Sequence, residues 1–343
     1  MKKKLFVLVL FLFLLTGCGK SNDNKRVLNV LNWSSYIPND VIIDFEKETG
    51  INVNYMTYSS NEELLAKISV AKSGTYDLIF PSDYMVEVMI KRKLIQPIDK
   101  SKLKNIHNLD FEYMDMEYDP GNIYTLPFIA TSTIISVNRD VIKDDIKSYN
   151  DLLDSKYKDE IVLIDDQRII IGMALLANGF DMNSTNETEL RIAKNWLLKL
   201  KSNLKAYDSD SPKNFLISNE ASIAVLWNAE GALASMENSS IENVVPNEGV
   251  ALSTDNFAIP KGAKNTSELY EFIDYILRPE VMAKIIESYP YKSINIPSYE
   301  YLGEDYINNN AANFSSDVVE NGHFVKNIGE YISLYDRVWA EIK

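Results

Sequence analysis

Cysteine and histidine are both scarce in this sequence. Cys18 is the only cysteine among 343 residues, which excludes an intramolecular disulfide and a zinc site built from several cysteines. His107 and His323 are the only histidines, and neither has the spacing of a metal-binding pair or of a base beside a nucleophile. We therefore expect no metal site and no cofactor.

Several signatures of catalysis and of nucleic-acid binding are also missing. There is no G-x-S-x-G motif and no glycine-rich phosphate loop. Asp208-Ser209-Asp210 resembles the start of a calcium loop but lacks the glycine and the closing glutamate. The formal net charge of −14 argues against nucleic acid, because phosphates require a basic face. A carboxylate pair would also suit a glycosidase, so a secreted hydrolase stays open as an alternative to a binding protein.

The N-terminus has the pattern of an export signal. Three lysines precede an uninterrupted apolar run over residues 5–15, which is shorter than the roughly 20 residues that span a bilayer as a helix. Leu15-Thr16-Gly17-Cys18 then follows the pattern of a bacterial lipobox. We expect residues 1–17 to be a lipoprotein signal peptide and residues 18–26 to be a tether lipidated on Cys18. The alternative is an ordinary secretory signal with a chance cysteine.

This signal predicts an extracytoplasmic protein anchored to a membrane by its lipid. The anchor would lie on the outer face of the cytoplasmic membrane, or on the periplasmic side where a second membrane is present. We expect the protein to be a monomer.

Strand and helix patterns alternate along the rest of the chain. Residues 27–33 have the composition of a buried strand, and the helix that follows begins at Pro38 and ends at Gly50. A second series of this kind starts after Asn138. Alternation of this kind predicts an α/β fold with parallel sheets.

Two extended segments, residues 130–137 and 251–260, flank the second series. We therefore predict a periplasmic-binding-protein-like fold, with two α/β lobes, two crossing segments and a ligand cleft between the lobes. Lobe 1 is expected to comprise residues 27–134 and 256–343, and lobe 2 residues 135–255. Ligands of open α/β sheets bind beyond the carboxyl ends of the strands, so the residues at the strand ends are expected to line the cleft.

Aromatic and acidic residues gather at these strand ends. A carboxylate attracts an ammonium group and accepts its N–H bonds, and a ring face adds a cation–π attraction of about 0.5–2 kcal/mol. A diamine or triamine joins such groups by methylenes, so it suits this lining. Each residue also has an ordinary structural explanation; Asp165 and Asp166, for instance, are suitable helix caps. Their shared location is the reason to predict a cation site.

Short motifs in a fixed order cover nearly the whole chain after Cys18. They include Asn32-Trp33-Ser34-Ser35-Tyr36-Ile37-Pro38, Pro81-Ser82-Asp83-Tyr84, Asp165-Asp166 with Arg168, Trp227-Asn228 and Leu277-Arg278-Pro279-Glu280. The ordered set resembles the bacterial spermidine/putrescine-binding proteins of ABC importers. The resemblance implies lobes that close on a polyamine, no catalysis, and partners in permease and ATPase subunits. By matched position, it implies ligand contacts at Trp33, Ser34, Tyr36, Ser82, Tyr84, Asp166, Ser209, Trp227, Asp255 and Tyr291.

Four positions depart from the pattern of that family. Ser35 stands where members usually have an acid, Ile169 where spermidine binders have a glutamate, Ser253 where an aromatic is found, and Val325 where an amide side chain can occur. Glu230 falls where putrescine-selective relatives carry an aspartate, so it joins the expected ligand site and favours putrescine over spermidine. The alternatives are another small organic cation, a sugar, an anion or ferric iron. An anion would require basic groups, and the inferred cleft offers only Arg168.

Overall fold

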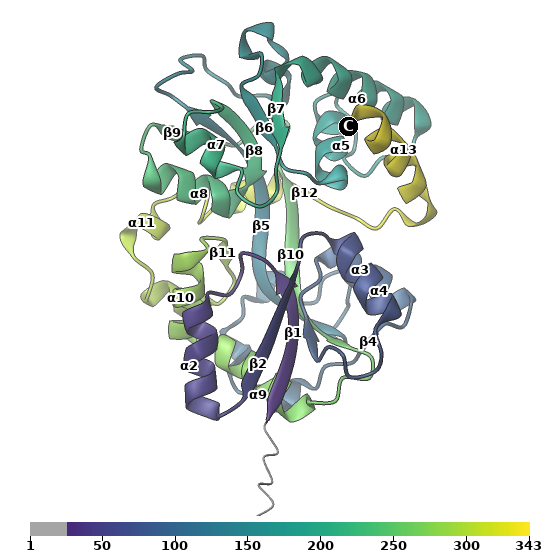
Figure 1. Ribbon diagram of the computed structural model, residues 1–343, viewed down its shortest axis with the longest axis vertical. Helices are drawn as coiled ribbons and strands as arrows, with labels where there is room; N and C mark the ends of the chain where they lie inside the picture. The colour runs from purple at the N-terminus through teal and green to yellow at the C-terminus, as the bar shows by residue number, and fades with distance from the viewer. Residues whose placement is uncertain (1–25) are drawn as a thin grey trace, which may run out of the picture.

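Two long strands connect the two halves of the molecule in the computed structural model, which describes residues 26–343 (Figure 1). β5 (Thr125–Asn138) and β10 (Ala251–Pro260) pair in antiparallel fashion, from Ser132 opposite Leu252 to Thr125 opposite Ala258. Every residue of both strands is buried. The two-lobed periplasmic-binding-protein fold with two crossing segments is thus confirmed.

The first half contains a mixed sheet in the order β2-β1-β3-β10-β5. β1 (Val27–Trp33) pairs in parallel with β2 (Asn52–Tyr58) and with β3 (Leu78–Ile79), and β10 joins β3 in antiparallel fashion. The other elements of this half are α2 (Asn39–Thr49), α3 (Asn61–Val70), α4 (Asp83–Lys91), β4 (Ile95–Gln96), α9 (Thr266–Ile276), α10 (Pro279–Ser288) and β11 (Lys292–Ser293).

The second half continues the sheet in the order β5-β8-β6-β7. β8 (Ile223–Trp227) is antiparallel to β5, whereas β6 (Ile161–Leu163) is parallel both to β8 and to β7 (Leu204–Tyr207). The other elements here are α5 (Gln167–Leu176), α6 (Glu187–Leu200), α7 (Lys213–Ile217), α8 (Asn228–Glu237) and β9 (Ile241–Val244). Two short helices, α11 (Glu304–Ile307) and α12 (Ser316–Glu320), precede β12 (His323–Phe324) and α13 (Ile332–Ile342).

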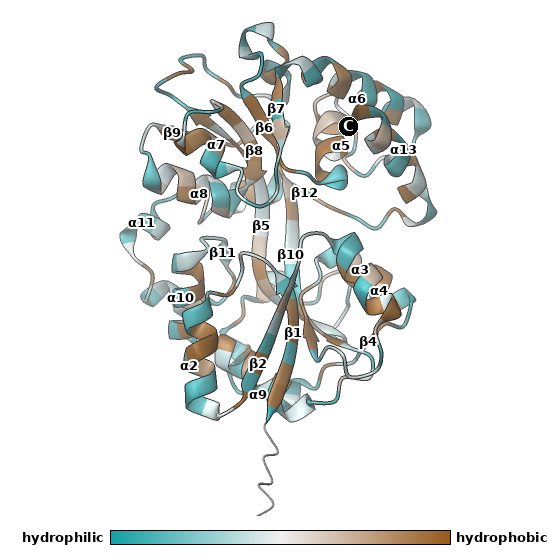
Figure 2. Cartoon of the chain, viewed as in Figure 1, coloured by the Kyte–Doolittle hydropathy of each residue, from teal (hydrophilic) through white to brown (hydrophobic). Residues whose placement is uncertain are grey.

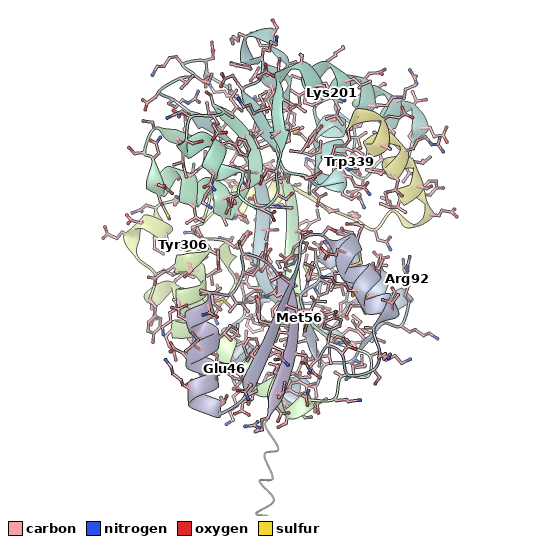
Figure 3. The ribbon with its side chains drawn as sticks, viewed as in Figure 1. Glu46, Met56, Arg92, Lys201, Tyr306 and Trp339 are labelled. Carbon is pink, nitrogen blue, oxygen red and sulfur yellow. The ribbon has the colours of Figure 1, made fainter. Side chains whose placement is uncertain are left out.

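The C-terminal helix packs on the second half of the molecule. α13 contacts α5 and α6, and Lys201 Nζ at the end of α6 donates to the Ile342 carbonyl oxygen at 3.0 Å. Figure 3 shows Lys201 and Trp339 in the same half. We expected residues 256–343 all to belong to lobe 1. α13 instead packs on the second half, because its apolar face is buried against α5 and α6.

Local signals explain where the first helices begin and end. Gly50 takes a left-handed conformation (φ 70°) and donates its N–H to the Glu46 carbonyl oxygen at 2.9 Å, which ends α2. Ser60 Oγ accepts from Glu63 N at 3.1 Å and caps the start of α3. Tyr149–Leu153 form a short 3-10 helix, which Ser148 caps by accepting from Asn150 N.

Hydrophobic residues are concentrated on strands such as β1 and β8, whereas the middle of β10 is hydrophilic (Figure 2). Within residues 26–343, no helix combines the length and the apolar character needed to cross a bilayer. The expected signal peptide, Cys18 and the tether up to residue 25 lie outside the described residues.

Phe45 connects α2 to α9 in the core of the first half. Its ring lies 4.9 Å from that of Phe272 at an interplanar angle of 86°, and 5.2 Å from that of Tyr275. Phe45 is completely buried. We expect Phe45→Ala to lower the free energy of unfolding by about 3–5 kcal/mol, because it leaves a cavity between the helices. Urea unfolding of the purified protein measures this loss.

Ile43→Ala on the same helix is the matched control, because Ile43 is 38% exposed. Its effect should stay within about 0.5 kcal/mol. Equal losses in the two variants would contradict the assignment of Phe45 to the core.

Candidate functional site

A pocket lies between the two halves. All eleven residues expected to contact a ligand line it, and so do the four divergent positions Ser35, Ile169, Ser253 and Val325. The eleven are Trp33, Ser34, Tyr36, Ser82, Tyr84, Asp166, Ser209, Trp227, Glu230, Asp255 and Tyr291. The structure therefore brings these eleven residues together in one lining, although the first and the last, Trp33 and Tyr291, are 258 positions apart in the sequence.

The pocket also has lining residues that were not expected to belong to the ligand site. Ser59 and Asn61 follow β2, Thr131 lies on β5, and Asp210 is next to Ser209. Ser59 and Asn61 obey the same strand-end rule that identified the others, so that rule would have found them. Thr131 lies inside a crossing strand and had no such signal.

Asp255 is the best-buried carboxylate of this lining. It lies on β10, is 2% exposed, and accepts hydrogen bonds from the Tyr36 hydroxyl and from Ser82 Oγ, the latter at 2.6 Å. Asn61 Nδ2 in turn donates to Ser82 Oγ at 3.0 Å. Burial raises the pKa of Asp255 to about 6, although both hydrogen bonds lower it. Within the described chain, no lysine, arginine or histidine forms an ion pair with Asp255.

Aromatic rings surround this carboxylate on the side of the first half. The Trp33 ring lies 4.6 Å from that of Tyr58 and 6.0 Å from that of Tyr36, which lies 4.9 Å from Tyr291. Trp33 Nε1 donates to the Phe80 carbonyl oxygen at 3.0 Å, which fixes the indole. The rings thus offer apolar and π surface next to a carboxylate, as a methylene chain with an ammonium end requires.

Asp166 provides a carboxylate from the second half. One of its oxygens, Oδ1, accepts from the backbone N–H groups of Arg168 and Ile169 at 2.9 and 3.0 Å, and so caps α5. Oδ2 makes no hydrogen bond among the residues described. Burial raises the pKa of Asp166, whereas the cap and Arg168 lower it. Both expected roles of Asp166, as a helix cap and as part of the lining, are thus compatible in one side chain.

Arg168 also lines the pocket, but its hydrogen bonds go to the protein. Its guanidinium lies 5.6 Å from the Tyr84 ring and 5.0 Å from the Tyr335 ring. One terminal nitrogen donates to Asn183 Oδ1 at 3.0 Å and to the Lys326 carbonyl oxygen at 2.9 Å. These contacts hold Arg168 between rings rather than at an anion, which argues against an anionic ligand.

Two acids of the lining already have lysine partners. Lys213 Nζ lies 3.3 and 3.2 Å from the two carboxylate oxygens of Glu230, and Lys343 Nζ lies 2.6 Å from Asp165 Oδ1. Burial raises the pKa of Glu230, and Lys213 lowers it. Glu230 was expected to hold a ligand nitrogen; it does line the pocket, but a lysine of the same chain already pairs with its carboxylate.

Residues 26–343 contain no group of three or more histidine, cysteine, aspartate or glutamate side chains arranged to hold a metal ion.

Comparison with known proteins agrees with this architecture. The family model described as "Bacterial extracellular solute-binding protein" matches residues 40–313. The spermidine/putrescine-binding periplasmic protein of Escherichia coli K12 is 35% identical over 322 residues, covering 94% of this chain and 92% of the relative. The putrescine-binding periplasmic protein PotF of the same organism is 32% identical over 314 residues, covering 86% and 85%.

A solved structure agrees as well. The spermidine/putrescine ABC transporter substrate-binding protein PotD from Streptococcus pneumoniae superposes with a TM-score of 0.79 at 30% identity, covering 92% of this chain and 98% of that one. The resemblance found in the motifs is thus confirmed over most of the chain. The chain belongs to the family of bacterial extracellular solute-binding proteins.

Proposed function

We propose that this protein captures a polyamine outside the cytoplasm and delivers it to the permease and ATPase subunits of an ABC importer, without catalysis. The observation that carries the proposal is Asp255, a buried carboxylate without an ion pair among the described residues, in an aromatic-walled pocket between two halves. The names of the relatives, which bind spermidine or putrescine, support the same ligand class.

A cationic ligand accounts for this pocket better than a neutral one does. A carboxylate removed from water is costly unless a positive charge compensates for it. An ammonium group would form charge-assisted hydrogen bonds with Asp255, and its methylenes would lie against the rings of Trp33 and Tyr36. A sugar would contact the same rings but would leave the charge of Asp255 uncompensated.

We propose further that putrescine is preferred over spermidine. Apart from the solvent-exposed Asp210, the acids of the lining that lack a lysine partner among the described residues are the buried Asp255 and the partly buried Asp166, whereas Glu230 is paired with Lys213. Ile169 and Ser253 add neither an acid nor an aromatic wall to the lining. Two available carboxylates match the two ammonium groups of a diamine.

The ligand-binding unit would be a monomer anchored by a lipid on Cys18. β1 begins at the end of the first half that lies farthest from the second half (Figure 1), so a tether leading to Val27 would leave the pocket open. The two lobes would divide near residues 134 and 256 as expected, except that α13 joins lobe 2 through its contacts with α5 and α6. Ligand binding would bring the lobes together.

Asp255→Asn tests the ligand class. Because the amide cannot compensate for an ammonium charge, putrescine affinity should fall about 10- to 100-fold, the range expected from the loss of a charge-assisted hydrogen bond of about 1.5–3 kcal/mol. Isothermal titration calorimetry with putrescine and spermidine measures the change. Asp305→Asn, at an exposed acid outside the pocket, is the control and should bind as the wild type does.

The polyamine assignment fails if the folded wild-type protein shows neither heat nor a thermal shift with either ligand at millimolar concentration. Equal binding by Asp255→Asn and the wild type would remove Asp255 from the site.

The affinity for putrescine should also depend on pH. The pKa of Asp255 is raised to about 6, and an ammonium binds the ionised carboxylate. Protonation therefore competes with the ligand, and the affinity should fall as the pH is lowered through about 6, approaching a tenfold loss per pH unit well below it. Titrations between pH 5 and pH 8 measure the profile.

The stability of the ligand-free protein should change with pH in the direction opposite to the affinity. Since the folded-state pKa of Asp255 is above its unfolded value, its contribution to stability is present at low pH and is lost as the pH rises through about 6. Asp255→Asn should lose this part of both profiles. An affinity for putrescine that is constant across this range would contradict the role of Asp255.

Lipidation at Cys18 predicts a membrane-bound protein. In cells fed labelled palmitate, the wild type should carry the label and sediment with membranes. Cys18→Ala should do neither, since Cys18 is the only cysteine. An unlabelled wild type that is released in the same way as Cys18→Ala would show an ordinary secretory signal instead.

A further inference from the structure

Lys213 lies behind the pocket wall and is paired with one of the acids of the lining. It is the first residue of α7, which packs against α8, and Glu230 lies in the first turn of α8. Lys213 Nζ contacts both carboxylate oxygens of Glu230, at 3.3 and 3.2 Å. The two side chains are only 20% and 11% exposed, so water screens this ion pair less than it would a surface pair.

The side chain of lysine ends in the same chemical group as the proposed ligand. Both present a primary ammonium on a chain of methylenes, and both seek a carboxylate. We propose that Lys213 is a specificity-determining residue, which occupies Glu230 as a tethered ammonium and thereby denies this carboxylate to the third nitrogen of a triamine. The inference rests on the proposed polyamine function.

Glu230 would otherwise be within reach of a ligand held by Asp255. Burial is the largest cause of the raised pKa of the Tyr291 hydroxyl, and the charges of Glu230 and Asp255 are the next two. All three residues line the same pocket. A polyamine with one nitrogen at Asp255 would therefore have Glu230 nearby as a further acceptor, if Lys213 were not there.

The segment leading to Lys213 is well ordered by its own hydrogen bonds. Asp208 Oδ1 accepts from the backbone N–H groups of Asp210 and Ser211 at 3.0 and 2.8 Å. Ser209 Oγ accepts from the backbone N–H of Asp165 at 2.8 Å. Because Lys213 is part of the same chain as Glu230, it competes for this carboxylate at an effective concentration that is typically in the millimolar range, whether or not a ligand is bound. Lys213 would thus produce specificity by disfavouring the longer ligand, which loses an acceptor for its third nitrogen, rather than by adding a contact to the shorter one.

The simpler explanation is that the ion pair only holds α7 against α8. That role would affect putrescine and spermidine equally, whereas the proposed role changes their ratio. The ratio of the two dissociation constants is therefore the deciding measurement, together with the thermal midpoint of each variant.

Lys213→Met in the full chain tests the proposal. Methionine keeps the length of the side chain and removes the charge, so Glu230 becomes available to a ligand nitrogen. Calorimetric titration should show spermidine binding about tenfold tighter relative to putrescine than in the wild type, as one added charge-assisted hydrogen bond would give. Lys205→Met, at an exposed lysine on β7 outside the pocket, should leave the ratio unchanged.

The double variant Lys213→Met/Glu230→Gln tests whether the gain for spermidine comes from Glu230. With the carboxylate removed as well, the gain for spermidine should disappear and the ratio should return to about that of the wild type. If Lys213→Met does not fold, Lys213→Gln replaces it, because glutamine also removes the charge while keeping a polar side chain at this position, and the same shift of the ratio toward spermidine is expected.

The outcomes separate the two proposals. A folded Lys213→Met with the wild-type ratio, or with parallel losses for both ligands, overturns the role of Lys213 and leaves polyamine binding intact. A gain for spermidine that persists in the double variant overturns it as well, because the gain would not come from Glu230. A wild-type protein that binds neither polyamine overturns the proposed function itself.

Discussion

The burial of Asp255 on a strand shared by both halves is the constraint on which the site depends. Asp255 lies where the pairing of β10 with β5 changes register, between Asp255 and Asn256. Such an irregularity turns a side chain out of its regular alternation. Ser82 forms an isolated bridge with Asp255, and its hydroxyl and that of Tyr36 supply the hydrogen bonds that a buried carboxylate needs. These bonds orient the carboxylate without neutralising it.

The surrounding structure supports the same arrangement. Asp83, at the start of α4, accepts from Ser253 Oγ at 3.1 Å and from Thr254 N at 3.3 Å, which holds that helix against β10. Burial raises the pKa of Asp83 to about 7, so two poorly solvated carboxyl groups are present here, Asp255 on β10 and Asp83 on the helix bonded to it. Their mutual repulsion and their desolvation are relieved by a positive charge near Asp255.

Much of this could be predicted from the sequence, because the signals involved are local. Strand residues such as 27–33 and helix boundaries such as Gly50 depend on neighbouring residues, and the strand-end rule converts them into a lining. The location of α13 could not be predicted in this way. Its amphipathic pattern shows that one face is buried, but not that α5 and α6 bury it. The ion pair of Lys213 with Glu230 was missed for a related reason. It joins two helices whose relative placement depends on packing, and a lysine at the first position of a short helix carries no signal of its own.

This ion pair changes the argument about selectivity, though not its direction. From the sequence, Glu230 favoured the diamine because it added an acid at a position typical of putrescine-selective relatives. With Lys213 beside it, Glu230 contributes little net charge to the pocket. The proposed preference for a diamine therefore rests on Asp166 and Asp255, the acids that remain besides the solvent-exposed Asp210. The number of carboxylates in a pocket is thus a poor measure of the number of cations it accepts. What matters is the number left without a partner after the protein's own lysines have been counted, because each buried carboxylate needs only one compensating charge.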